Sequence, residues 1–385
     1  MPVTVSQVFS ALAISSLLLT SICVPLVCLL ARRVGFVDHP AAGVYKTHTE
    51  PTPYGGGLAI WLGVVVPLSA MLCWLAVSRQ RMFHDGVEWI SPWAPYLFFP
   101  LEPWSPTVVQ VSQIVAAVAA ASMLLLLGLA DDRRALPAGL RFGVQLVLAC
   151  LLTTVVPGFR LALFEGPEVV GIVGSVVWLV AMTNSFNFLD NMNGLSAGLA
   201  AIIIGTCGAI ALITQHVPAA ILCLVVLGSC TGFLMYNFPR ASIFMGDAGG
   251  LFLGFLGGAL SILLYDRLAT IAVAPDTLPY RFLPLAVFGV PLYDLVTVVG
   301  LRLRRGLAPW AGDTNHVSHR LVAAGLSRTQ AVLVLCALAA LVAFPCAGAM
   351  SSGPVGAWWS LGGATAAIAL FGVVDLWLAR RRDAR

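Results

Sequence analysis

Long apolar runs, separated by short polar segments, follow one another along this chain. Most of them approach or exceed the roughly 20 residues that an α-helix needs to cross the hydrocarbon core of a bilayer. The pattern predicts an all-α, polytopic membrane protein with about 11 transmembrane helices in a single membrane-embedded domain, residues 1–385. The predicted spans are residues 5–30, 55–77, 107–130, 142–157, 168–186, 195–215, 218–236, 248–264, 282–301, 329–349 and 356–379.

The composition supports this class of protein. Apolar residues make up 59% of the chain and charged residues only 10%, whereas about 25% of the residues in an average soluble domain are charged. The nine cysteines lie in apolar runs and form no CxxC pair, so we expect small buried side chains without disulfides or a metal. The first apolar run lacks a basic start and is too long for a cleavable signal peptide, which favours a first span.

The basic residues predict the orientation, because cytoplasmic loops carry an excess of Lys and Arg. With the N-terminus outside, only five of the 21 basic residues fall on the outer side. They are Arg79, Arg81, Arg160, Arg267 and Arg281. The C-terminal "ARRRDAR" is then cytoplasmic. In the outer loop 78–106, Trp93, Tyr96 and Trp104 are typical of aromatic residues at a membrane interface.

Five polar clusters interrupt the apolar pattern, and with this orientation all of them lie at the cytoplasmic face. Polar groups near a membrane are costly unless they are paired or have a function. The clusters therefore predict a functional site in loops near residues 35–55, 131–141, 184–195, 237–248 and 302–328. They read "KTHTEPTPYGGG" (46–57), "LADDRRALPAGLR" (129–141), "NSFNFLDNMNG" (184–194), "NFPRASIFMGDAGG" (237–250) and "DTNHVSHRL" (313–321).

Two of the clusters place carboxylates at the ends of spans. Asp131 and Asp132 end the third predicted span, where the helix dipole disfavours negative charge and where the two groups repel each other. A bound cation would offset both costs, and so would ordinary ion pairs with Arg133 and Arg134. Asp247 begins the eighth span among glycines, where it could bind a metal or simply cap the helix.

The third cluster is rich in amides. Asn184, Asn187, Asp190 and Asn193 are spaced by three, so on a helix they would form one polar stripe. Amide and carboxylate oxygens suit a hard cation, and amide hydrogens suit a nucleotide or a sugar. Hydrogen bonding between helices is the alternative interpretation.

Basic and imidazole side chains accompany the carboxylates. Lys46 and His48, in a loop stiffened by prolines, and His316, His319 and Arg320 are candidates for binding phosphate or sugar. Solvated loop charges are the alternative for the first pair. Two histidines three apart could be half of a zinc site, but no cysteine or further histidine lies nearby in the sequence.

Asp294 lies inside the ninth predicted span, and a carboxylate at membrane depth is a functional candidate by default. We expect its partner to be Arg302, Arg304 or a residue from another helix. Taken together, the hard oxygen ligands predict Mg²⁺ or Mn²⁺ rather than zinc, and the cations predict phosphate ligands. Transfer of a phosphoryl group from a nucleotide to a lipid phosphate requires such a setting, because two anionic reactants must be brought together.

These motifs, in this order, resemble the polyprenyl-phosphate N-acetylhexosamine-1-phosphate transferases, which are glycosyltransferase family 4. The resemblance is to the branch that uses undecaprenyl phosphate and N-acetylglucosamine, and this family is related to phospho-MurNAc-pentapeptide translocase. The resemblance covers roughly residues 35–325. Asp131, Asp132 and Leu136 match the family pattern DDxxxL, and Arg141 and Gln145 fit its continuation. Residues 184–195 resemble the pattern NxxNxxDGxDGL, and residues 244–250 resemble FMGDxGS. Asp313, His316 and His319 resemble the pattern DxxHxHH, and residues 46–56 resemble KxHxxPTPxGG.

The resemblance implies a role for each matching residue. Asp131, Asp132, Asp190 and Asp247 would be catalytic, and Asp247, Asp190 and Asp132 would bind Mg²⁺. Asn187, Asn193, Asn237 and Phe244 would bind the nucleotide, with Phe244 stacked on uracil. Lys46, His48, His316, His319 and Arg320 would bind phosphate or sugar, and Arg141 and Asp294 are additional candidates.

The resemblance also implies the reaction and its setting. We expect transfer of N-acetylglucosamine-1-phosphate from UDP-N-acetylglucosamine to undecaprenyl phosphate, with release of UMP. The product would start a lipid-linked cell-envelope glycan such as the O-antigen of lipopolysaccharide. The enzyme would lie in the bacterial inner membrane with its site facing the cytoplasm. It would bind no nucleic acid, and a homodimer is compatible with the family.

Three positions depart from the family patterns. Asn193 replaces the second aspartate of DGxDG, Ser318 replaces the middle histidine, and Gly250 replaces the usual serine. All four candidate catalytic aspartates remain, so we expect an active enzyme whose sugar preference is open. A silent scaffold would be expected to lack one of them.

Two other functions remain as alternatives. The first keeps the reaction class and uses UDP-MurNAc-pentapeptide as donor, although the two-imidazole motif and the eleven spans argue against it. The second is a cation-coupled transporter that uses Asp190 and Asp294 as ion sites. A transporter predicts polar residues near the bilayer midplane on several helices, whereas here only Asp294 lies deep.

Overall fold

The computed structural model describes residues 5–39, 50–85, 106–161, 167–271, 278–310 and 314–383. This part of the chain is almost entirely helical, and its two short strands, β1 (Val37–Asp38) and β2 (Thr52–Pro53), pair in antiparallel fashion. Ten of its helices are long and apolar enough to cross a membrane, and a bent pair of helices makes an eleventh candidate. The predicted all-α, polytopic fold is therefore confirmed.

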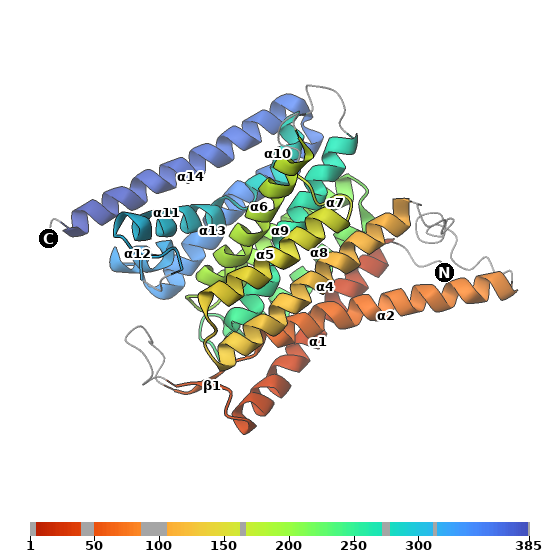
Figure 1. The fold of residues 1–385 in the computed structure, drawn as a ribbon, viewed down its shortest axis with the longest axis horizontal. Helices are drawn as coiled ribbons and strands as arrows, with labels where there is room; N and C mark the ends of the chain where they lie inside the picture. The colour runs from red at the N-terminus through yellow and green to blue at the C-terminus, as the bar shows by residue number, and fades with distance from the viewer. Residues whose placement is uncertain are drawn as a thin grey trace.

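The helices follow the predicted apolar runs closely (Figure 1). In chain order they are α1 (Val5–Arg33), α2 (Gly56–Asp85), α4 (Pro106–Arg133), α5 (Ala138–Val155), α6 (Glu168–Leu189), α7 (Leu195–Ile213), α8 (Val217–Asn237), α9 (Gly246–Ile271), α10 (Leu278–Ala286), α11 (Gly289–Arg304), α12 (Val317–Ala323), α13 (Arg328–Gly348), the short 3₁₀ helix η3 (Ala349–Ser351) and α14 (Gly353–Asp383).

Helix α9 lies at the centre of the bundle, packed against α2, α4, α6, α7 and α10 (Figure 1). The most apolar part of α9 is completely buried. Small residues in its first turns let the neighbouring helices approach closely. A Cβ on Gly57 of α2 would lie 2.3 Å from the backbone nitrogen of Gly249, and one on Gly128 of α4 would lie 2.4 Å from Cα of Ala248. These contacts bring the start of α2 and the end of α4 together around the start of α9.

The ninth span differs from the prediction of one continuous helix over 282–301. It consists of α10 and α11, which meet at an angle of 66°. Pro291 explains the break, because it has no N–H to donate to the carbonyl of Val287 four residues earlier. The helix resumes when Leu292 donates to the carbonyl of Phe288 at 2.9 Å. The bend places Asp294 in the second of the two helices.

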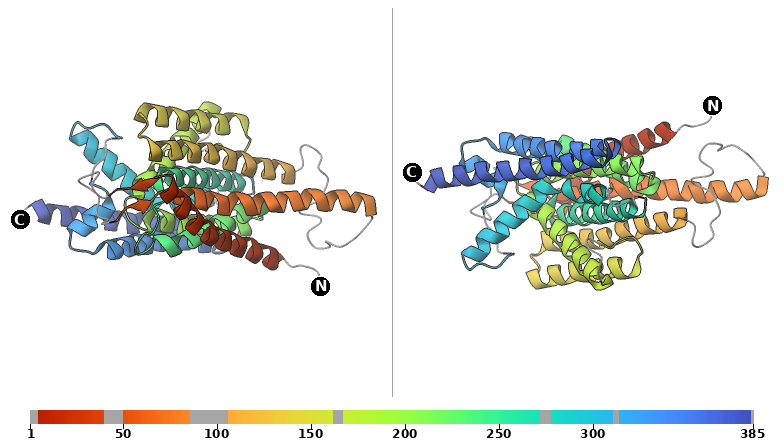
Figure 2. Two further views of the ribbon diagram at one scale, coloured as in Figure 1. Left: turned by 90° about the horizontal axis from the view of Figure 1, so that it is seen from below. Right: turned by 90° about the horizontal axis from the view of Figure 1, so that it is seen from above.

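The chain runs up and down through the bundle, so alternate loops gather at one end. The ends of α1, α4, α6, α8 and α11 and the starts of α2, α5, α7 and α9 meet there. The start of α1 and the end of α14 lie toward opposite ends of the long axis (Figure 2). The arrangement suits an odd number of spans, while the side of the membrane that each end faces stays a prediction. Trp93, Tyr96 and Trp104 lie outside the described residues.

Candidate functional site

The centre of the site lies where α4 ends and α9 begins. Asp132, in the last turn of α4, accepts hydrogen bonds from the backbone N–H groups of Asp247 (2.8 Å) and Ala248 (3.2 Å). These N–H groups belong to the first turn of α9 and have no partner within their own helix. The carboxylate therefore lies at the positive end of the α9 dipole, which compensates for its unfavourable position at the end of α4.

Arg141, from the first turn of α5, joins two of the aspartates. Its Nη1 donates to Asp131 Oδ2 at 2.6 Å and lies 3.3 Å from Asp247 Oδ2. The other oxygen of Asp131 accepts the backbone N–H of Leu136 at 2.6 Å. Sequence reasoning proposed adjacent arginines as partners of the acidic pair, whereas the partner in the structure comes from the following helix.

The end of α6 closes the site on its other side. Asn187 Nδ2 donates to Asp247 Oδ1 at 2.9 Å, and the backbone N–H of Gly246 donates to Asp190 Oδ2 at 3.0 Å. Gly246 has a φ of 75°, and a Cβ there would lie 2.5 Å from Asp132 Oδ2, so glycine is required. Burial and the charges of Asp132 and Asp247 raise the pKa of Asp190 well above its usual value.

The four carboxyl groups of Asp131, Asp132, Asp190 and Asp247 are thus brought together around the start of α9. Among the described residues, their ion pairs are formed with Arg141 alone. Carboxylate oxygens are the ligands that Mg²⁺ prefers, so the donor set fits this cation. No group of three or more His, Cys, Asp or Glu side chains in the described part of the chain is already arranged around a metal position. Binding a cation would therefore require some of these side chains to change partners.

The predicted polar stripe is only partly present, because α6 ends at Leu189. Asn193 lies beyond the helix, and its Nδ2 donates to the carbonyl of Pro239 at 3.3 Å. Asn184 is on the helix, but its amide donates to Gln145 Oε1 of α5 at 2.6 Å. Of the four stripe residues, Asp190 is one of the four clustered aspartates, which we call the acidic centre, and Asn187 contacts another of them, Asp247.

Asn237, at the end of α8, is buried and hydrogen-bonded on both sides of its amide. Its Oδ1 accepts the backbone N–H of Gly194 at 2.5 Å, and its Nδ2 donates to the carbonyl of Ile243 at 2.8 Å. These bonds join the loop after α6 to the loop before α9. In the structure Asn237 therefore holds these two loops together. Its predicted contact with a nucleotide stays a prediction.

Phe244 lies on the side of the site formed by the strand pair. Its backbone N–H donates to the carbonyl of Pro53 at 2.8 Å, and its half-buried ring lies 6.0 Å from the ring of Tyr54. Burial and the charges of Asp38, Asp132 and Asp247 raise the pKa of Tyr54. Sequence reasoning did not single out Tyr54, although it stands within the glycine-rich motif at the start of α2.

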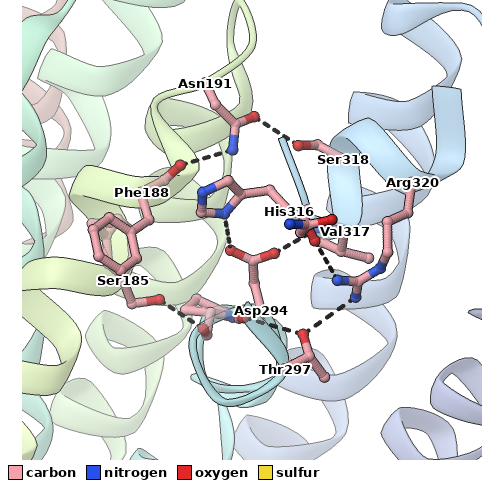
Figure 3. A network of polar contacts seen from close by, with 12 residues as sticks. Ser185, Phe188, Asn191, Asp294, Thr297, His316, Val317, Ser318 and Arg320 are labelled. Carbon is pink, nitrogen blue, oxygen red and sulfur yellow. Dashed lines mark hydrogen bonds and ion pairs between the residues drawn. The ribbon is translucent and has the colours of Figure 1, made fainter. Parts of the chain in front are cut away.

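A second polar network surrounds Asp294 (Figure 3). Asp294 is fully buried, and its Oδ2 lies 2.8 Å from His316 Nδ1 while its Oδ1 accepts the backbone N–H of Val317 at 2.7 Å. Ser318 donates to Asn191 Oδ1 at 2.7 Å, which ties α12 to the loop after α6. The partner of Asp294 is therefore a residue from another segment, one of the possibilities expected. Arg302 instead donates to the carbonyl of Pro309.

Arg320 is held by the last helix. Its guanidinium donates to both carboxylate oxygens of Asp375 in α14, at 3.0 and 2.7 Å, and to the hydroxyl of Thr297 at 3.2 Å. It also donates to the carbonyl of Asn315, and Tyr293 donates to Asp375 at 2.6 Å. Arg320 thus fixes α12 against α11 and α14, and its predicted contact with phosphate stays a prediction. Asp375 was missed, although an aspartate within a predicted span is the signal that singled out Asp294.

The remaining predicted residues are placed only in part. The ring of His319 lies 6.4 Å from that of His316, which stands at the N-cap of α12 rather than within it. Lys46, His48 and Asp313 lie outside the described residues.

The fold and the site together define a polytopic helical membrane protein with an acidic, amide-lined site at the ends of its spans. The family model described as glycosyl transferase family 4 matches residues 114–265, which include most of α4, all of α6 and the start of α9. The chain is 31% identical over 331 residues to a probable undecaprenyl-phosphate N-acetylglucosaminyl 1-phosphate transferase of Bacillus subtilis, covering 84% of this chain and 79% of that protein.

Two further relatives agree with this match. A decaprenyl-phosphate N-acetylglucosaminephosphotransferase of Mycolicibacterium smegmatis is 30% identical over 335 residues, covering 82% of this chain and 75% of the relative. An undecaprenyl-phosphate alpha-N-acetylglucosaminyl 1-phosphate transferase of Escherichia coli K12 is 25% identical over 328 residues, covering 82% and 76%. The chain therefore belongs to the polyprenyl-phosphate N-acetylglucosaminyl-1-phosphate transferases of glycosyl transferase family 4.

Proposed function

We propose that this protein transfers N-acetylglucosamine-1-phosphate from UDP-N-acetylglucosamine to undecaprenyl phosphate and releases UMP. An oxygen of the lipid phosphate attacks the β-phosphorus of the donor. The bond from that phosphorus to the oxygen bridging it to the α-phosphorus breaks, and the bridging oxygen leaves with UMP. The names of the relatives support the acceptor and the transferred group.

The observation that carries this proposal is the convergence of four carboxylates and one arginine at the ends of membrane spans. Such a position lets a water-soluble nucleotide and a lipid phosphate meet at the same centre. Asp247, Asp190 and Asp132 would hold Mg²⁺, which neutralises negative charge on a diphosphate when it is bound. Asp131 and Arg141 flank this group, and Arg141 provides a cation for a phosphate oxygen.

The nucleotide would lie between the end of α6 and the strand pair. The amide of Asn187 donates to Asp247, and the ring of Phe244 lies beside Tyr54, whose pKa is raised by the charges of Asp132 and Asp247 among its causes. Stacking of a base on an aromatic ring contributes about 1–3 kcal/mol in other nucleic-acid sites. We infer that Phe244 supports the uracil and that the N-acetylglucosamine extends toward His316. We place the site at the cytoplasmic face, where nucleotide sugars are available.

The alternative functions gain no support. The relatives are named for N-acetylglucosamine rather than for MurNAc-pentapeptide. For a transporter, polar residues would have to gather near the middle of the spans, whereas the acidic centre lies at helix ends. UDP-N-acetylglucosamine is therefore the donor of choice for the first experiment.

Purified protein in detergent, given UDP-N-acetylglucosamine, undecaprenyl phosphate and Mg²⁺, should release UMP and not UDP. EDTA should abolish the release, and Asp247→Asn should lower the rate at least 100-fold. Asp266→Asn is the matched control, because this residue lies 19 positions later in the same helix, about 28 Å along its axis. Absence of UMP from the wild-type protein with this donor and acceptor would contradict the proposed function.

A further inference from the structure

The protonation of His316 follows from the bonds that Asp294 makes. An ionised carboxylate can only accept hydrogen bonds. One oxygen of Asp294 accepts the N–H of Val317, and the other faces His316 Nδ1, so with Asp294 ionised the tautomer that fits this contact carries its proton on Nδ1. The second ring nitrogen, Nε2, points away from Asp294 toward the end of α6 (Figure 3). The contact with Asp294 therefore fixes the orientation of the imidazole and determines that Nδ1 is the nitrogen bonded to the carboxylate.

The end of α6 connects this imidazole to the acidic centre. Asn187 points to Asp247, whereas the next residue, Phe188, packs its ring edge-on against His316 at 5.7 Å. The guanidinium of Arg302 covers the ring of Phe188 at 4.9 Å. Consecutive residues of one helix thus contact the two polar groups, Asn187 the carboxylate of Asp247 and Phe188 the imidazole of His316.

On this basis, and resting on the proposed function, we propose that Asp294 is a positioning residue of the transferase. It holds His316 so that Nε2 is the one ring nitrogen presented to the sugar diphosphate of the donor. Asp294 itself is fully buried, and the residue His316 beside it is 5% exposed. Groups that orient a metal-ligating histidine typically change metal affinity or activity by about 10- to 100-fold when they are replaced, and we expect an effect of the same order for Asp294.

Asp294→Asn separates this role from simple packing, because the two side chains have nearly the same shape. The N–H of Val317 can only donate, so the amide oxygen of the asparagine must face it. The amide NH₂ then faces His316 Nδ1, which has to give up its proton in order to accept. The neutral imidazole consequently carries its proton on Nε2, and the substrate-facing nitrogen changes from acceptor to donor.

The first test is spectroscopic and requires no turnover. Protein labelled with ¹⁵N-histidine should show His316 protonated on Nδ1 in the wild type and on Nε2 in Asp294→Asn, with His316→Gln assigning the signal. UDP-N-acetylglucosamine should shift the Nε2 resonance of the wild-type protein. Unchanged protonation in the variant, or no shift with the nucleotide sugar, would overturn the proposal.

The second test is a double-mutant cycle on UMP release. Asp294→Asn should lower kcat/KM for the donor about 100-fold, and in the His316→Gln background it should cause little further loss, because it acts through the imidazole. Asp266→Asn should leave kcat/KM unchanged in both backgrounds. Independent, multiplying losses would assign Asp294 a merely structural role. A wild-type protein that releases no UMP would refute the proposed function, while the spectroscopic test would still judge the Asp294–His316 pair.

Discussion

At the scale of single residues, the start of α9 is held in place by close contacts that leave little space for other side chains. Asp132 caps the helix from outside, Gly246 turns the chain with a positive φ, and Gly250 lies against the backbone of α6. The sequence predicted that Asp247, placed among glycines, could bind a metal or cap the helix. The structure shows that the room beside Gly246 and Gly250 is filled by protein.

Gly250 provides a prediction that runs against the family pattern, in which serine occupies this position. A Cβ at residue 250 would lie 2.8 Å from Cα of Asn187, a backbone atom that cannot move independently of α6. We expect Gly250→Ser to destabilise the protein by about 1–3 kcal/mol, as overpacking does, and to lower its melting temperature in detergent. Gly143→Ser is the control, because a Cβ there would meet nothing within 4 Å. Equal melting temperatures for the two variants would contradict the packing of α6 on α9.

Residue identities in the acidic centre could be predicted, but their partners could not. The four aspartates stood out because charge is rare in apolar runs. The partner of Asp131 is Arg141, one helix further along the chain, and Asp132 compensates the dipole of a helix 114 positions away rather than its own. Such contacts depend on how helices pack, and a single sequence carries no local pattern that specifies them.

At the scale of helices, a buried ion pair joins the last span, α14, to α12. Asp375 of α14 has a side chain that is 4% exposed and bonds both Arg320 and Tyr293. Removing one partner of a buried pair leaves an uncompensated charge, which is strongly destabilising, whereas replacing both partners by apolar groups often is not. The pair therefore determines how α12 is held against the bundle.

Asp375→Ala is expected to destabilise the protein by on the order of 3 kcal/mol, because it leaves Arg320 buried and unpaired. The double variant Asp375→Leu/Arg320→Met should recover most of that loss. Thermal unfolding of the three proteins in the same detergent measures both effects. Additive losses in the double variant would show that the two side chains do not depend on each other.

Helix positions were predicted well where the apolar runs were long, and less well where a proline or polar residues interrupt them. The ninth span was predicted as one helix because its hydropathy is continuous across Val287 and Phe288. Pro291 was present in that run, but proline is also tolerated in membrane helices, so its effect depended on packing. The end of α6 at Leu189 was likewise hidden, because a spacing of three continues through Asn193.

At the scale of the whole molecule, the number of spans and their alternation bring all the polar clusters that the structure describes to one end. The side of the membrane that this end faces is a prediction, and it rests on the basic residues alone. We therefore predict that green fluorescent protein fused after Arg385 is fluorescent in bacterial cells and that alkaline phosphatase fused there is inactive. The reverse pair of results would place the site on the outer side and exclude a cytoplasmic nucleotide sugar as its substrate.

The measurement that tests the central claim most directly follows the β-phosphate of the donor. Purified protein is given UDP-N-acetylglucosamine labelled with ³²P at the β-position, together with undecaprenyl phosphate and Mg²⁺, and the label is counted after extraction into butanol. Transfer of N-acetylglucosamine-1-phosphate predicts that the label enters the lipid phase, and that it does not do so with Asp247→Asn. Label that stays in the water phase as UDP, while sugar enters the lipid, would contradict the proposed reaction.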